Sequence, residues 1–141
     1  MYNVQFAIDK SCAAIYEGIA IHKIEQWYAA QGFRIHARYN EANGLEQKRG
    51  YDLIDTYGKK WEVKCDRKAL STGNVFVEHQ ALDHSEADYW IILAGLAYIL
   101  PRQSLLDARN EQYRVVRGGD DLRAIGTLLP LSELKSLAEI V

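Results

Sequence analysis

Residues 51–65, YDLIDTYGKKWEVKC, are the stretch of sequence that decides the fold. Apolar and polar residues alternate here with a period of two, which predicts strands over Tyr51–Asp55 and Lys59–Cys65. Three residues join them, and a three-residue hairpin loop favours a last residue in the left-handed conformation, as Gly58 allows. The stretch therefore predicts a β-hairpin.

The register of this hairpin places acidic side chains against each other. If Asp55 pairs with Lys59, Asp52 lies directly opposite Glu62, and two carboxylates at such positions repel. A positive charge nearby should offset the repulsion between these two carboxylates. Lys64 lies on the same face as Glu62, because side chains two apart on a strand point the same way.

The reverse face of the second strand, with Trp61, Val63 and Cys65, is apolar and is expected to pack in the core. A hard cation such as Mg²⁺ is bound by one or two carboxylates, carbonyl oxygens and waters. Asp52, Glu62 and the Val63 carbonyl fit that donor set. The alternative interpretation is a surface hairpin with a cross-strand ion pair, which contributes little to stability.

A long helix is expected over residues 9–31, with Asp9 or Ser11 as its N-cap and Gly32 after its end. Glu17 falls within one of its apolar stripes, where an unpaired carboxylate is costly. If that stripe faces the hairpin, Glu17 joins the carboxylates. The alternative is that Glu17 pairs with a lysine or arginine.

The remaining elements are shorter, and Tyr89–Ala94, the most apolar, is expected to be central in the sheet. The other expected elements are strands over Phe33–Tyr39, Asn74–Glu78 and Tyr113–Arg117, a helix over Gln103–Arg109, and a last helix opening at residues 130–132 with Ser132 as its cap. The order predicts one domain over residues 1–141, with the first helix packed on a mixed sheet of four to five strands in an α/β or α+β arrangement.

Composition excludes several classes of protein. The 141 residues contain two cysteines outside any CxxC pair, which excludes a disulfide scaffold or structural zinc module and indicates a reducing compartment, the cytoplasm. The longest apolar run, Tyr89–Leu100, is too short to span a membrane, and no secretory signal is expected. A net charge of −2 argues mildly against affinity that comes mostly from phosphate neutralisation, although basic residues gather between Lys59 and Lys68.

Asp52, then Glu62-Val63-Lys64 on the next strand, with Glu17 on a preceding helix, resembles the PD-(D/E)xK nuclease superfamily. Residues 62–66, 72–74, 78 and 87–90 are similar to its small phage-type members. The resemblance covers residues 9–100 and implies a restriction-endonuclease-like core of order αβββαβ. The sequence departs from the pattern because Gly50 and Tyr51 precede Asp52, without the usual proline. Asp55 is thus a second candidate ligand, but it lies on the opposite strand face.

The resemblance implies a Mg²⁺- or Mn²⁺-dependent DNA endonuclease that acts in the cytoplasm, which would be that of the host if the chain is phage-encoded. Similar motifs occur in enzymes that resolve branched or junction DNA, in restriction enzymes and in exonucleases. The short chain favours structure-selective or weakly specific cutting. Asp52, Glu62, the Val63 carbonyl and Glu17 would hold the metal, and Lys64 would orient the attacking water or stabilise developing charge. Glu78 is a candidate outer ligand that binds through water, but a structural role or a substrate contact is the favoured interpretation. The expected substrate contacts are Lys59, Arg67, Lys68, Thr72 and Asn74.

Several of these residues, and the function itself, also fit other interpretations. Arg67 and Lys68 also fit a solvated surface, and residues 72–74 fit an ordinary turn. A non-catalytic DNA-binding or accessory protein on the same fold is the main alternative function, and an interaction module without metal dependence is another. One active site per chain favours a homodimer if both DNA strands are cut.

Overall fold

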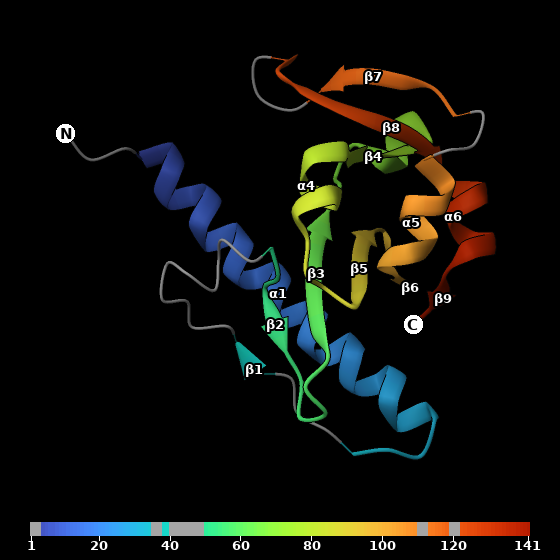
Figure 1. Cartoon of the computed structure of the whole chain (residues 1–141). Helices are drawn as coiled ribbons and strands as arrows, with labels where there is room; N and C mark the ends of the chain where they lie inside the picture. The colour runs from blue at the N-terminus through green and yellow to red at the C-terminus, as the bar shows by residue number, and fades with distance from the viewer. Residues whose placement is uncertain (1–3, 35–37, 40–49, 110–112, 119–121) are drawn as a thin grey trace.

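The structure is a computed structural model that describes residues 4–34, 38–39, 50–109, 113–118 and 122–141, with the backbone alone for residues 4–14 and 38–39. The described residues form five helices and nine strands, and the strands lie in two sheets (Figure 1). The α/β class expected from the sequence is confirmed. No helix in this part of the chain is long and apolar enough to cross a membrane.

The larger sheet is mixed, as predicted, but it has six strands, in the order β1-β2-β3-β5-β6-β9. β3 and β5 are parallel, and all other neighbouring pairs are antiparallel. Gly95, at φ 79°, turns the chain between β5 and β6 and so divides the long apolar run into two strands. The strands are β1 (Arg38–Tyr39), β2 (Leu53–Ile54), β3 (Lys60–Cys65), β5 (Tyr89–Ala94), β6 (Leu96–Pro101) and β9 (Glu139–Ile140).

A second, three-stranded sheet has the order β4-β8-β7, with strands β4 (Asn74–Glu78), β8 (Ala124–Pro130) and β7 (Val115–Gly118). The bounds expected for the strand at Asn74 are confirmed, but this strand leaves the hairpin's sheet. It pairs along its whole length with β8, which the sequence did not reveal. Figure 1 shows this sheet at one end of the molecule.

Helix α1 (Val4–Ala30) covers one face of the larger sheet (Figure 1). Ala20 and Ile24 are fully buried and pack in one core cluster with Trp61, Ile91 and Ile99. The helix begins before both predicted caps, so the expectation for Asp9 and Ser11 was wrong. Gly32, at φ 87°, follows the end of the helix as predicted.

The opposite face of the sheet packs against the remaining helices and the second sheet. Trp90, Ile92 and Leu100 lie in this core cluster with Leu82 and Leu105. β5 is therefore buried on both faces, which explains its uninterrupted apolar sequence. The helices are α3 (Ala69–Thr72), α4 (His79–His84), α5 (Arg102–Arg109) and α6 (Leu131–Leu137). Pro130 is the N-cap of α6, so Ser132 lies inside that helix and is not its cap.

The β2–β3 hairpin has the predicted register and the predicted left-handed glycine. Leu53 faces Trp61 and Ile54 faces Lys60, while Gly58 has φ 78°. The same register aligns Asp52 with Glu62.

Asp55 is fully buried and holds the hairpin loop to α1. Its Oδ2 accepts hydrogen bonds from the Tyr28 hydroxyl at 2.6 Å and the Trp61 indole N–H at 2.9 Å. Its Oδ1 accepts the backbone N–H groups of Tyr57 and Lys59. All of these bonds are internal, so Asp55 has a structural role.

We expect Asp55→Asn to lower the free energy of unfolding by about 1–3 kcal/mol, because an amide N–H would replace an acceptor and leave the Trp61 N–H unsatisfied. The Tyr28 hydroxyl can rotate to accept from the new amide, but an indole N–H can only donate. Urea unfolding in EDTA measures the change. Tyr28→Phe, which removes one donor and leaves the carboxylate with three, should cost less; an equal or larger cost would contradict this account.

Candidate active site

Asp52 stands where the β2–β3 ladder ends. Its N–H donates to the Trp61 carbonyl at 2.8 Å, and its Oδ2 accepts the Val63 N–H at 2.8 Å. A continuing strand would offer a backbone carbonyl to that N–H. The carboxylate takes the carbonyl's place, so the side chain of Asp52 lies beside β3 at Val63.

The Val63 carbonyl points to the same side of β3. Within a strand the N–H and C=O of one residue point the same way, and successive residues alternate. The N–H of Lys60, three residues earlier, donates to Asp88 Oδ2, and the Lys60 carbonyl accepts the Asp88 N–H, so both groups point towards β5. Val63 therefore directs its carbonyl away from β5, towards Asp52.

Glu62 lies next to Trp90 of β5 in the parallel ladder. Burial, followed by repulsion from Asp52, raises the pKa of Glu62 to about 8, and Lys64 opposes the rise while Glu17 adds to it. Among the described residues no hydrogen bond or ion pair reaches its carboxyl group. Lys64 therefore offsets only part of the cost of charging Glu62.

Glu17 reaches the same region from α1. Burial raises its pKa, and the charge of Asp52 raises it further. The pKa of Asp52 is also raised by burial, although the hydrogen bond from Val63 opposes the shift. The structure therefore brings Glu17, Asp52, Glu62 and Lys64 close enough for their charges to interact.

This donor set suits a magnesium ion. The described His, Cys, Asp and Glu side chains form no group of three that could hold a metal ion as they stand. Mg²⁺ needs fewer protein ligands, because it keeps several waters and binds through one or two carboxylates. Asp52, Glu62 and the Val63 carbonyl supply oxygen donors. The raised pKa values show that burial disfavours the charged form of both carboxyl groups, a cost that a bound cation would offset.

We expect the metal-free protein to lose stability as the pH rises from about 5 to 8. The folded pKa of Glu62, about 8, lies above its ordinary value of 4.5, so between these values the folded state holds a proton that the unfolded state has lost. The stabilisation from this proton is fully present below the pKa of Glu62 in the unfolded chain and is lost as the pH rises through its pKa in the folded protein. The expected change in the free energy of unfolding is on the order of 2 kcal/mol once relaxation is allowed for.

Glu62→Gln should flatten this dependence and stabilise the protein at pH 8 in EDTA. Chemical denaturation at several pH values measures the slope. Glu133→Gln, at an exposed position on α6, is the matched control and should retain the wild-type slope. A slope that Glu62→Gln leaves unchanged would contradict the assigned burial of this carboxyl group.

Four of the five expected DNA contacts are exposed and Asn74 is half-buried, and several already bond within the protein. Lys59 lies in the hairpin loop, and Lys68 is the N-cap of α3. Arg67 donates to the Tyr16 hydroxyl, with its guanidinium carbon 5.2 Å from the centre of that ring. Thr72 and Asn74 bond each other around Gly73: the Thr72 hydroxyl donates to the Asn74 carbonyl, and the Asn74 amide donates to the Thr72 carbonyl.

Glu78 lies apart from the carboxylates of the hairpin. It ends β4 in the second sheet, pairs with Gly126 and precedes α4. Neither Asp52 nor Glu62 has a pKa shift caused by Glu78. The structure thus brings Glu17 to the site, but not Glu78.

Gly50, two residues before Asp52, lies against the end of α4. It has φ 69°, and an added Cβ would lie 2.8 Å from the His84 carbonyl oxygen. Its own carbonyl accepts a hydrogen bond from the Ser85 hydroxyl at 2.9 Å. Only glycine allows this approach to the end of α4, which positions the chain leading into Asp52.

Sequence reasoning missed the structural role of Asp66. Its Oδ1 accepts the N–H groups of Lys68 and Ala69, and its Oδ2 accepts that of Phe76. It therefore fixes α3 and β4 directly after β3. An aspartate just before a short helix was the available signal.

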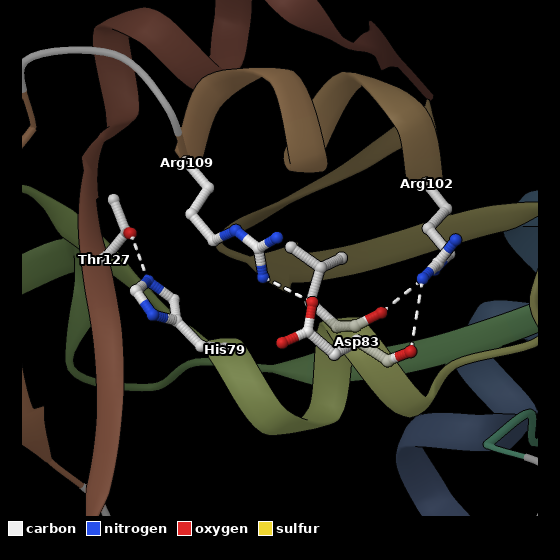
Figure 2. A network of polar contacts seen from close by, with 6 residues as sticks. His79, Asp83, Arg102, Arg109 and Thr127 are labelled. Atoms are coloured by element: carbon white, nitrogen blue, oxygen red, sulfur yellow. Dashed lines mark hydrogen bonds and ion pairs between the residues drawn. The ribbon is translucent and has the colours of Figure 1, made fainter.

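A second polar network joins α4 to α5 and β8 (Figure 2). Arg102 donates from Nε to the Leu82 carbonyl at 2.9 Å, and Arg109 pairs with Asp83, which lowers the pKa of that carboxyl. His79 hydrogen-bonds Thr127 at 2.8 Å. The two arginine contacts hold the C-terminal end of α4, and the His79 contact holds its first residue, so the network has a structural role.

No protein-family model and no curated protein matches this chain.

Proposed function

We propose that the chain is a Mg²⁺- or Mn²⁺-dependent deoxyribonuclease with a restriction-endonuclease-like core, which hydrolyses phosphodiester bonds in DNA. The observation that carries this proposal is the convergence of Asp52, Glu62, Lys64 and Glu17 at one edge of β3. The order of α1, the β2–β3 hairpin and a parallel β5 supports the same core. Selectivity for branched DNA and a phage origin remain implications of the sequence resemblance.

The chain's own residues divide the work between binding and catalysis. Asp52, Glu62, the Val63 carbonyl and Glu17 would hold the metal, whose bound form lowers the pKa of water and neutralises charge on the phosphate. Lys64 extends on the Glu62 face and would donate hydrogen bonds to the attacking water or to the developing charge. Lys59 and Lys68 would contact the DNA backbone.

Incubation with supercoiled plasmid and with labelled four-way junctions tests the proposal. We expect nicking with Mg²⁺ or Mn²⁺ and none with EDTA. The double variant Asp52→Ala/Glu62→Ala, purified identically, controls for contaminating nucleases. Absence of cleavage with every metal and substrate, from folded protein, would overturn the proposal. Binding to DNA under those conditions would indicate the non-catalytic alternative.

A further inference from the structure

A cleft of about 370 Å³ opens on the α1 side of the sheet, between α1, the end of β3 and the β5–β6 turn. Two of its lining residues adjoin the candidate site in sequence. Tyr16 precedes Glu17 on α1, and Cys65 follows Lys64 on β3. Neighbouring residues of a strand point to opposite faces, so Cys65 lines the cleft on the face of β3 that is turned away from Lys64. The volume of the cleft lies within the range of small-molecule pockets.

The lining combines an apolar surface with positive charge. Ile19, Leu93 and Ala97 contribute apolar side chains, and Lys23 and Arg67 contribute cations. The acidic residue in the wall, Asp66, already accepts three backbone N–H groups. Such a cleft fits a ligand with a flat apolar part and adjacent negative charge.

One wall of the cleft is a pair of groups suited to stacking. The Arg67 guanidinium lies over the Tyr16 ring and donates to its hydroxyl, so α1 and the turn after β3 hold each other in place. Aromatic rings and guanidinium planes are the surfaces on which unpaired bases stack. An aliphatic partner would not need either group.

We propose that this cleft accepts an unpaired nucleobase of a bound DNA strand. Tyr16 and Arg67 supply the stacking surface, and Lys23 contacts a flanking phosphate. The inference rests on the proposed nuclease function and deepens it: the substrate is DNA with an unpaired nucleotide. Fully paired DNA lacks a base free to enter.

Binding measured in EDTA, where DNA is not cut, tests the inference directly. Three fluorescent duplexes of one sequence are compared by anisotropy: fully paired, with one bulged thymine, and with an abasic site at that bulge. We expect the bulged thymine to bind on the order of tenfold more tightly than the abasic bulge, the scale of one stacked base. The abasic duplex has the same bend, so the difference isolates the base.

Variants separate stacking from charge. Tyr16→Ala should abolish the preference for the thymine, whereas Lys23→Ala should weaken all three duplexes similarly and reduce the salt dependence. Tyr57→Ala, at an exposed tyrosine in the hairpin loop, is the matched control and should keep the preference. If Tyr16→Ala retains the full preference, the cleft is not the base-binding site.

Cys65 provides a second measurement that does not depend on a substitution in the cleft wall. The chain has two cysteines, so Cys12→Ser leaves Cys65 as the single thiol. We expect the bulged thymine to slow alkylation of Cys65 by N-ethylmaleimide more than the abasic bulge does. Equal alkylation rates with both duplexes, at saturating DNA, would overturn the inference.

The outcomes distinguish this inference from the proposed function. Metal-dependent cleavage without any preference for the unpaired base overturns the inference and leaves the nuclease proposal intact. Loss of both cleavage and DNA binding overturns the two together. Leu70 and Leu96 are exposed at the rim, so a second copy of the chain is the competing occupant. A dimer in sedimentation that Leu96→Glu converts to a monomer would support that occupant and overturn ours.

Discussion

Asp52→Ala and Glu62→Ala should each abolish DNA cleavage, a loss of at least on the order of 10³ in rate, since metal-ion catalysis contributes several kcal/mol. Both should also weaken the binding of Mg²⁺ or Mn²⁺ in calorimetric titration. The physical reason is that each removes one carboxylate from a set that already sits close together at the edge of β3. Glu133→Ala is the control and should behave as wild type.

The same two variants should have the opposite effect on the empty site. Burial raises the pKa values of both carboxyl groups, and the charge of Asp52 raises that of Glu62 further. For Glu62→Ala we expect stability in EDTA to be unchanged or increased at pH 8, which separates lost metal binding from misfolding. Asp52→Ala should gain less, because it also removes the acceptor of the Val63 N–H. Calorimetric titration with unchanged metal binding in both variants would refute the assignment.

Lys64→Met should slow cleavage by on the order of 10²–10³ while leaving DNA binding nearly intact at moderate salt. Lys64 is one of several cations along β3 and the following turn, so its loss removes about one unit of phosphate neutralisation. The Lys64 ammonium is expected to act on the attacking water or on the developing charge, so its loss raises the barrier to cleavage and has little effect on DNA binding. Single-turnover cleavage at saturating enzyme isolates that step.

Lys59→Ala and Arg67→Ala provide the comparison. They should show weaker, salt-sensitive binding with the cleavage of bound DNA largely preserved, because these residues lie outside the carboxylate cluster. If all three variants lose binding equally, with no rate defect specific to Lys64, this region is a general phosphate-binding surface. The non-catalytic alternative would then be favoured.

The hairpin was predictable because everything that determines it is local. The period-two pattern, the loop length and Gly58 fix its register within 15 residues, and that register aligns Asp52 with Glu62. The place of Glu17 among apolar residues was predictable for a related reason: helical geometry fixes which neighbours share its stripe. The sequence could not show the distance from that stripe to the hairpin, which depends on how α1 packs on the sheet.

The parts that sequence could not supply depend on distant partners. Asn74–Glu78 is a strand by its own pattern, but its choice of sheet depends on β8, some 50 residues later. Asp55 and Asp66 look like ordinary polar residues in sequence. Their importance comes from N–H groups that only the folded chain brings to them.

The parallel pairing of β3 with β5 also determines the order in which the molecule assembles. The hairpin forms through contacts between residues close in sequence, whereas α3, β4 and α4 separate β3 from β5 along the chain. Contacts of that separation form slowly, since loop closure precedes any gain from pairing. The carboxylates of Asp52 and Glu62 therefore come together early, while both are still in water, and become buried only after β5 has paired with β3. Mild acid, which neutralises them, should therefore accelerate refolding of the metal-free chain.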